Sequence, residues 1–140
     1  MTKEQYLLNL LRENSRRSVS DLAKEMGLSR STVQQTMERL ERTGVIQGYT
    51  VKVSPHYEQQ RVSAYIMISA VPKKTIEVVR ELTKQPQLDM LCSISGRYDL
   101  IAQVTEETTE ALDKIIDLIA ALDGVEKTLS HIVLSSKVSR

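Results

Sequence analysis

The sequence predicts an α+β protein in which a three-helix unit precedes a sandwich of the order βαββαβ. Three observations lead to this fold class. Apolar residues recur with helical spacing as far as Gly44, the repeat then shortens to two residues, and beyond residue 61 apolar strands alternate with amphipathic helices. With 140 residues, of which 41% are hydrophobic, the chain is long enough for two small domains.

Two short helices are predicted at the N-terminus. The first begins with the capping-box pattern of Thr2 and Gln5. The second is expected to begin at the N-cap Ser20 and to end at Gly27, because glycine adopts the left-handed conformation at the least cost. The residues expected to face the core are Leu7, Leu10 and Leu11 in the first helix and Leu22, Ala23 and Met26 in the second.

A third helix is predicted from the N-cap Ser29 to a point just before Gly44. Val33, Met37 and Leu40 recur at i, i+4 and i+7, and they form its buried stripe. Beyond this helix, residues 45–53 alternate with a period of two, and we expect them to form a short strand or wing.

The face of the third helix opposite its buried stripe carries side chains suited to reading DNA. Glutamine can bridge adenine, arginine can bridge guanine, and hydroxyls reach bases or phosphates. In a helix-turn-helix the second helix packs across the third, whose N-terminal end enters the major groove. The pattern therefore predicts binding to double-stranded DNA. The expected DNA-binding residues are Ser29, Arg30, Ser31, Thr32, Gln34, Gln35, Arg39 and Arg42.

The charges of the chain are distributed in a way that fits this prediction. Residues 1–53 contain nine Lys and Arg against six Asp and Glu, whereas residues 54–140 contain ten against twelve. A basic excess favours contact with phosphates. The cations expected to contact the DNA backbone are Arg16, Arg17, Lys24, Arg39 and Arg42. Glu38 would repel phosphate, and we expect it to pair with Arg42 at i+4.

The domain boundary is predicted in the polar segment 54–60, which begins with Ser54-Pro55. This gives a helix-turn-helix domain over 1–53, a linker over 54–60 and a second domain over 61–140. In the second domain the expected strands cover 62–71, 88–95, 100–104 and 127–138, and the expected helices cover 74–84 and 109–123. This order is that of a ferredoxin-like sandwich, in which both helices cover one face of an antiparallel sheet. In the helix over 74–84, Ile76, Val79 and Leu82 are expected to face inward.

The predicted sheet is apolar on both faces. Tyr65 and Met67 point away from the side that holds Ile66 and Ile68, and Leu91, Ile101 and Val133 likewise oppose the other apolar residues of their strands. Singly exposed apolar residues are common. A whole face of them needs a cover, however, and the simplest cover is a second copy, which predicts a two-fold homodimer.

Several other kinds of site and function are not expected. A single cysteine rules out an internal disulfide and a multi-cysteine zinc site, and His56 and His131 lack ligand spacing, so we expect no metal, no cofactor and no catalytic site. Cys92, in phase with Met90 and Ile94, is expected in the core. The sequence shows neither an apolar run of about 20 residues nor a signal peptide, and this favours a cytoplasmic protein without membrane contact.

Three segments resemble one known family. SVSDLAKEMGLSRSTVQQTMERLERTGVIQGYTV, residues 18–51, resembles the winged helix-turn-helix of the Lrp/AsnC regulators. SGRYDLIAQV, residues 95–104, resembles the Gly-x-Tyr-Asp signature of their ligand-binding domain. DGVEKTLSHIVL, residues 123–134, resembles the approach to their last strand, with Ser130 in place of a threonine. The first helix departs from the family pattern, since Lys3-Glu4-Gln5-Tyr6 replaces its Leu-Asp-x-x-Asp opening.

The resemblance implies a DNA-binding regulator that assembles from dimers into an octamer or a related assembly and binds an amino acid or similar small molecule between dimers. Carried over, it implies that the effector-binding residues are Gly96, Arg97, Tyr98, Asp99, Thr128 and Ser130. Asp99 is suited to pair with an α-ammonium group. The alternative is that residues 96–99 form only a tight hairpin.

Two other functions stay open at this point. One is tetrapyrrole chemistry, because the sirohaem decarboxylases, enzymes that resemble the Lrp/AsnC family, use the same architecture and rely on histidines. The other is a stand-alone sensor whose first domain makes only protein contacts. The polar face of the third helix and the two isolated histidines favour the DNA-binding regulator over both.

Overall fold

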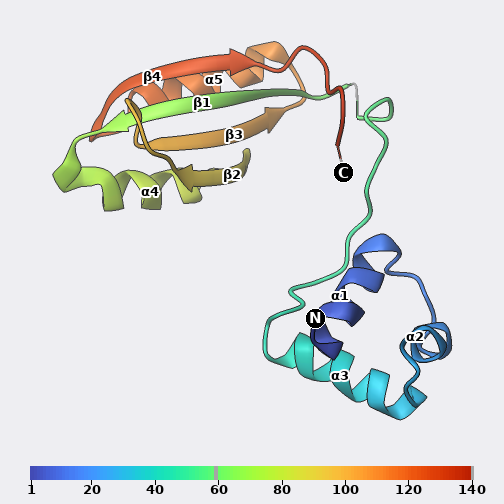
Figure 1. The fold of residues 1–140 in the computed structure, drawn as a ribbon. Helices are drawn as coiled ribbons and strands as arrows, with labels where there is room; N and C mark the ends of the chain where they lie inside the picture. The colour runs from blue at the N-terminus through green and yellow to red at the C-terminus, as the bar shows by residue number, and fades with distance from the viewer. Residues whose placement is uncertain (59, 140) are drawn as a thin grey trace. The chain divides into compact units, whose positions relative to one another are not determined.

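The structure is a computed structural model that describes residues 1–58 and 60–139. The chain divides into two compact units, Met1–Lys52 and a second that begins at Val53. The first contains three helices, α1 (Lys3–Glu13), α2 (Val19–Met26) and α3 (Arg30–Arg42). The second contains a four-stranded sheet, two α-helices and a short 3-10 helix (Figure 1). The predicted fold class is confirmed.

The helices of the first unit pack around a small aliphatic core. Its members are Leu7, Leu10, Leu11, Leu22, Ala23, Val33 and Leu40. Met26 and Met37 lie at the edge of this core and are only partly buried. Each helix therefore buries the stripe that its apolar spacing predicted, because burial of these side chains outweighs weak local preferences in such short helices.

Side-chain caps define where these helices begin. The capping box of α1 is confirmed, with the Thr2 hydroxyl accepting from the Gln5 amide and the Gln5 side chain accepting from the Thr2 amide. The prediction that Ser20 caps α2 is wrong. Ser18 is the N-cap, with its hydroxyl 3.1 Å from the Asp21 amide nitrogen, and this earlier start lets Val19 pack against the core. Gly27 ends α2 with φ at +66°, as predicted.

Residues 45–53 were expected to form a short strand or wing, and in the described structure they form no strand. The Ile46 amide donates to the Leu40 carbonyl at 2.9 Å and the Ile46 side chain packs against the core, so the first residues only close α3. From Gln47 onward the segment is exposed and joins no ladder in the described chain. A strand needs a neighbour to accept and donate backbone hydrogen bonds, and this helical unit offers none.

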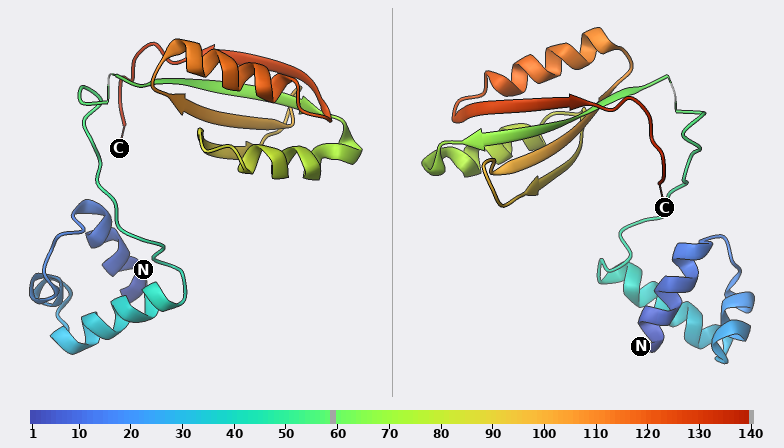
Figure 2. Two further views of the ribbon diagram at one scale, coloured as in Figure 1. Left: turned by 180° about the vertical axis from the view of Figure 1, so that it is seen from behind. Right: turned by 45° about the horizontal axis from the view of Figure 1, so that its top comes forward.

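The second unit is an antiparallel sandwich. In chain order its elements are β1 (Val62–Ala70), the short helix η1 (Pro72–Lys74), α4 (Thr75–Thr83), β2 (Leu88–Ser93), β3 (Leu100–Glu106), α5 (Thr109–Ala120) and β4 (Val125–Ile132). The strand order is β2-β3-β1-β4, and all three pairings are antiparallel. Both α4 and α5 cover the same face of the sheet (Figure 2).

The core of the sandwich lies between these two helices and the sheet. The side chains buried there include Ile66 and Ile68 from β1, Leu100 and Val104 from β3, Val78 and Leu82 from α4, and Leu112 and Ile119 from α5. Ile76 was expected in this core but is 75% exposed. The side of α4 that faces the sheet carries Val78 and Leu82, which are four residues apart, with Val79 partly buried beside them, and Ile76 lies away from that side of the helix. The last strand also differs, since it begins at Val125 and ends at Ile132.

A β-bulge changes which side chains of β2 face the core. Leu88 pairs with Val104 and Met90 pairs with Gln103, so Asp89 is the extra residue. As a result both Leu88 and Leu91 pack against the core, while Met90 and Cys92 turn to the other face. The predictions that Leu91 lies on the uncovered face and that Cys92 lies in the core are therefore wrong.

Candidate DNA-binding helix, effector loop and family

The predicted DNA-binding residues lie on α3 and its cap. Val33 and Leu40 are buried, and all eight predicted side chains are exposed. No hydrogen bond or ion pair within the described chain engages the side chains of Gln35 or Arg42. The exposed face therefore offers an amide and a guanidinium with free hydrogen-bonding groups.

Three hydroxyls gather at the N-terminal end of α3. Ser29 Oγ accepts from the Thr32 amide at 3.2 Å, and it lies 2.7 Å from Thr32 Oγ1 and 3.2 Å from Ser31 Oγ. Ser29 is therefore first a cap that fixes where α3 begins. The cluster stands at the positive end of the helix dipole, where a phosphate is favoured.

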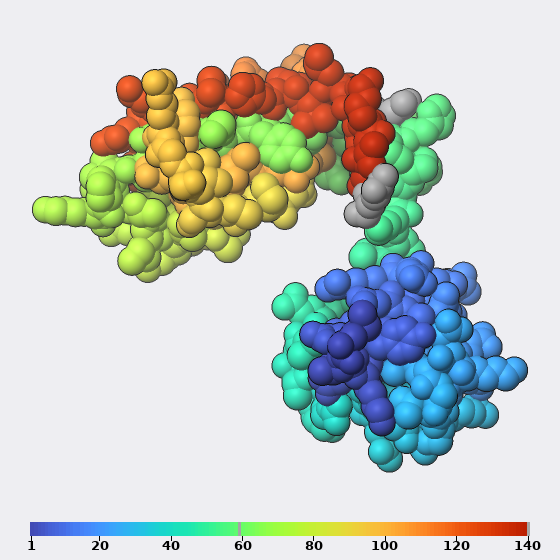
Figure 3. Space-filling view, in the orientation of Figure 1, coloured from blue at the N-terminus to red at the C-terminus, as the bar shows by residue number. Residues whose placement is uncertain are grey.

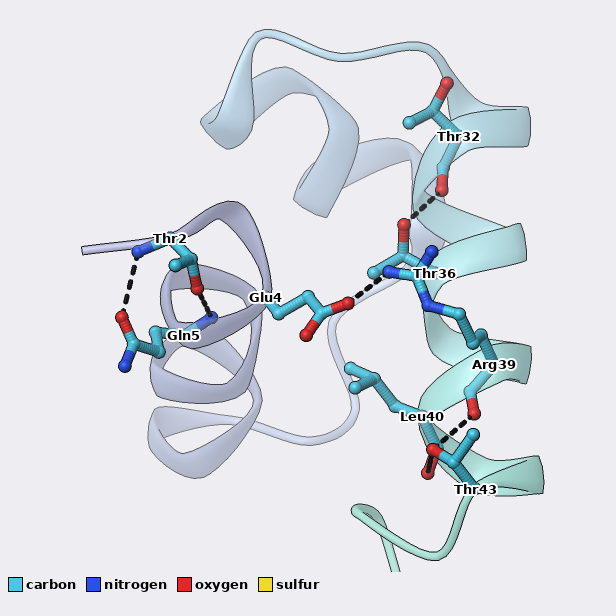
Figure 4. Close-up of polar contacts among 8 residues, drawn as sticks. All are labelled: Thr2, Glu4, Gln5, Thr32, Thr36, Arg39, Leu40 and Thr43. Carbon is cyan, nitrogen blue, oxygen red and sulfur yellow. Dashed lines mark hydrogen bonds and ion pairs between the residues drawn. The ribbon is translucent and has the colours of Figure 1, made fainter.

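The C-terminal half of α3 is held by side-chain contacts that were not predicted. The Glu38 carboxylate accepts a hydrogen bond from the side-chain amide of Gln34 at 3.3 Å. The expected ion pair between Glu38 and Arg42 is not formed in the described chain. Arg39 forms an ion pair with Glu4 of α1 (Figure 4). Both Glu38 partners satisfy the i, i+4 rule, so spacing alone does not choose between them.

The segment after α3 is anchored by Tyr49. Its hydroxyl donates to the Glu41 carboxylate at 2.8 Å. Partial burial raises the pKa of Tyr49, and the hydrogen bond and the negative charge of Glu41 raise it further, so the phenol stays a donor. A cleft of about 480 Å³ beside it is lined by Ser15, Arg16, Tyr49, Thr50 and Val51.

One of the other cations expected to contact the DNA backbone, Arg17, forms an ion pair with Glu13 at 3.4 Å.

The loop between β2 and β3 contains the Gly-x-Tyr-Asp sequence and is tied to the sheet. Gly96 has φ at +116°. The Asp99 amide donates to the Ile68 carbonyl, and Asp99 Oδ2 accepts from the Ala70 amide, both at 2.8 Å. One carboxylate oxygen of Asp99 thus has a structural role that the sequence did not predict.

The remaining predicted effector residues fall into two groups. Arg97 is exposed and Tyr98 is half-buried in the same loop. Thr128 pairs with Ile68 across the ladder, and Ser130 pairs with Ile66. Thr128 is therefore aligned with Leu100, the first residue of β3 after the loop, with β1 between them. Ser130 lies two residues farther from the loop end of the sheet.

The face of the sheet opposite the helices is uncovered within this unit (Figure 3). It carries an apolar cluster, with the polar Gln103 and His131 paired to Tyr65 beside it. Tyr65 is 37% exposed and Leu129 is 42% exposed. They share this face with the half-buried Met67, Met90 and Ile101 and with the exposed Cys92. We call these six side chains the uncovered face. The prediction of a sheet with apolar residues on both sides is confirmed, with Met90 and Cys92 in place of Leu91.

Other kinds of site find no support in the described residues. His56 and His131 are both exposed, and no three His, Cys, Asp or Glu side chains in the described chain come together as metal ligands. None of the helices described here is both long and apolar enough to cross a membrane.

Comparison with known proteins gives matches along almost the whole chain. Residues 6–47 match the winged helix-turn-helix DNA-binding family, and residues 63–140 match the Lrp/AsnC ligand-binding domain. An uncharacterised HTH-type transcriptional regulator of Pyrococcus abyssi is 34% identical, with 94% of this chain and 84% of the relative covered. The HTH-type transcriptional regulator FL11 of Pyrococcus furiosus is 28% identical, with 91% and 85% covered.

Solved structures agree with these matches. Escherichia coli AsnC superposes with a TM-score of 0.84 at 25% identity, with 98% of this chain and 93% of that chain covered. The leucine response regulatory protein LrpA of Mycobacterium tuberculosis gives 0.84 at 27% identity, with 99% and 96% covered. A Neisseria meningitidis transcriptional regulator in complex with L-Met shares the fold, with a TM-score of 0.83 at 22% identity and 99% and 93% covered.

These matches decide between the functions left open by the sequence. The relatives are transcriptional regulators, not enzymes, so the tetrapyrrole alternative is set aside. The two family models also match the two units of the chain in order, one model for each unit. The chain therefore belongs to the Lrp/AsnC family of transcriptional regulators, with a DNA-binding helix-turn-helix followed by a ligand-binding domain.

Proposed function

We propose that this regulator acts in the cytoplasm and binds a specific sequence of double-stranded DNA through the outward side of α3. The observation that carries the proposal is that α3 buries Val33 and Leu40 and leaves the whole opposite side polar and exposed. Dimers joined through the uncovered face present two such helices. Half-sites about one helical turn apart, roughly 34–36 Å, then follow from the two-fold symmetry.

The side chains of this surface divide into base-reading and backbone-binding groups. Gln35 is exposed with its amide free, so it can both donate to and accept from one adenine. Arg42 has no ion-pair partner among the described residues and lies near the C-terminal end of α3, where the helix leaves the groove, so it is suited to a phosphate. Gln35 therefore supplies specificity, and Arg42 supplies affinity.

Replacing Gln35 with alanine is expected to change sequence discrimination more than overall affinity. Loss of a bidentate contact should remove about 1–3 kcal/mol of preference at one base position. Arg42→Ala is the matched contrast. It should weaken binding to all sequences alike and reduce the slope of log affinity against log salt by about 0.9. Titration of both variants against every single-base change of an operator selected from genomic fragments measures this. Equal weakening on all sequences by Gln35→Ala would refute its base-reading role.

We infer that the second domain binds an amino acid or a similar zwitterion beside the Gly96–Asp99 loop. Three observations support this inference. The domain matches a ligand-binding family, a relative of the same fold was solved with L-Met, and Asp99 keeps one carboxylate oxygen beyond its bond to Ala70. An ammonium group needs such an acceptor in a partly dry pocket. A ligand held between dimers would also shift their assembly into octamers and their DNA affinity by linkage.

Asp99→Asn is expected to weaken effector binding and leave the fold intact. An asparagine oxygen can still accept from the Ala70 amide, so the loop keeps its shape while the negative charge is lost. Calorimetry of wild type and variant against the twenty amino acids measures the effect, and sedimentation checks that dimers persist. If no amino acid gives heat or changes sedimentation of the wild type, the amino-acid proposal fails.

A further inference from the structure

An ion pair joins the first and third helices at the edge of the DNA-reading surface. The carboxylate of Glu4, in the first turn of α1, accepts from the guanidinium of Arg39 in α3 (Figure 4). The two residues lie 35 positions apart in the chain. The other ion pair described in this unit, between Arg17 and Glu13, is local to the end of α1. The Glu4–Arg39 pair is thus a tertiary contact that involves one of the expected DNA-binding cations.

Arg39 stands next to the base-reading residues. It follows Gln35 by four positions, so both occupy the same edge of α3, one turn apart. Cations in this position flank the groove and meet the phosphate backbone. Its side chain is 50% exposed and that of Glu4 is 46% exposed, so neither is enclosed by the protein. Ion pairs this exposed are weak, and a phosphate can replace the carboxylate.

We propose that Glu4 competes with DNA phosphate for Arg39 and thereby lowers the DNA affinity of this regulator. This inference rests on the proposed function. When DNA arrives, the Arg39 guanidinium exchanges the Glu4 carboxylate for a phosphate oxygen. Glu4 then remains as an unpaired negative charge beside the negatively charged backbone. Both effects oppose DNA binding. While Glu4 is present, its negative charge cancels most of the attraction between the positive charge of Arg39 and the DNA phosphates.

Glu4→Gln tests the proposal because it removes the charge and keeps the size of the side chain. At about 100 mM salt it is expected to bind the selected operator roughly two- to fivefold tighter, the range that an exposed ion pair corresponds to. The slope of log affinity against log salt should steepen by up to about 0.9, because one more phosphate is neutralised. In an Arg39→Gln background the same change should tighten binding clearly less, because only the repulsion between Glu4 and the DNA backbone is then removed.

Glu25→Gln is the matched control, because it makes the same charge change in α2 at an exposed residue that has no ion-pair partner in the described chain. It should alter affinity by less than half as much. If Glu4→Gln does not tighten binding, or tightens it equally without Arg39, the proposal is wrong. If Glu4→Gln instead weakens DNA binding and lowers the melting temperature, the ion pair stabilises the packing of α1 against α3, and the proposal is also wrong. Absence of DNA binding by the wild type would overturn the proposed function itself, and that result is obtained before any variant is needed.

Discussion

Replacing Tyr65 and Met67 together with glutamate is expected to turn the proposed dimer into a folded monomer. Both side chains lie in the middle of the uncovered face, and Tyr65 is 37% exposed within the isolated unit. Met67 is half-buried, so in a single unit water still reaches both positions, and charges there cost less than in a dimer that covers them. In a dimer joined through this face, each protomer would bury two unpaired carboxylates, at a cost of several kcal/mol each. Sedimentation of the variant should give the monomer mass, and circular dichroism should show an intact fold.

The control for this experiment places the same charges on the other side of the sandwich. Ile76 and Leu118 are apolar residues of α4 and α5, with exposed fractions of 75% and 42%. Glutamate at both positions should leave the dimer intact, because no partner is proposed to cover them. A wild-type chain that sediments as a monomer would contradict the proposed dimer, and so would equal dissociation by the two pairs of substitutions.

Gly124→Ala is expected to destabilise the second unit by about 2–5 kcal/mol. Gly124 has φ at +94°, a conformation that costs other residues about 1–2 kcal/mol. An added Cβ would also lie 2.7 Å from Lys74 Cβ and 3.0 Å from Val78 Cγ2, at the start of α4. Overpacking of this kind typically costs a further 1–3 kcal/mol. Urea unfolding of the full chain, followed on the transition of the sandwich domain, measures the loss.

Gly96→Ala separates the two causes of this loss. Gly96 has a similar backbone conformation, with φ at +116°, but an added Cβ there meets no atom within 4 Å. Only the cost of about 1–2 kcal/mol for the backbone should remain. Equal destabilisation by both substitutions would show that the close approach of α4 to Gly124 is not important.

The fold could be predicted from the sequence because each element buries a periodic stripe. The stripe of α3, Val33, Met37 and Leu40, also defines its outward side, so the candidate DNA-reading residues follow from the same spacing. The details that failed depend on choices that spacing leaves open. Ser18 and Ser20 are equally good caps by chemistry, and only the packing of Val19 selects the first.

The polar contacts of the site could not be predicted for a different reason. The pair of Arg39 with Glu4 and the bond from the Ala70 amide to Asp99 span 35 and 29 residues, so they depend on tertiary placement. No local rule relates residues this far apart. The rule for residues four apart did apply to Glu38, but it allowed Gln34 as well as Arg42.

The bulge at Asp89 reverses which side chains of β2 point to each surface of the sandwich. The backbone ladder absorbs the extra residue, and the Thr105 hydroxyl donates to the Asp89 carboxylate beside it. Upstream of this point even-numbered residues of β2 face the helices, and downstream odd-numbered ones do. Removing Asp89 would turn the downstream half of the strand over and exchange Leu91 for Met90 and Cys92. One extra residue thus decides which side chains of β2 join the core and which lie on the outer surface.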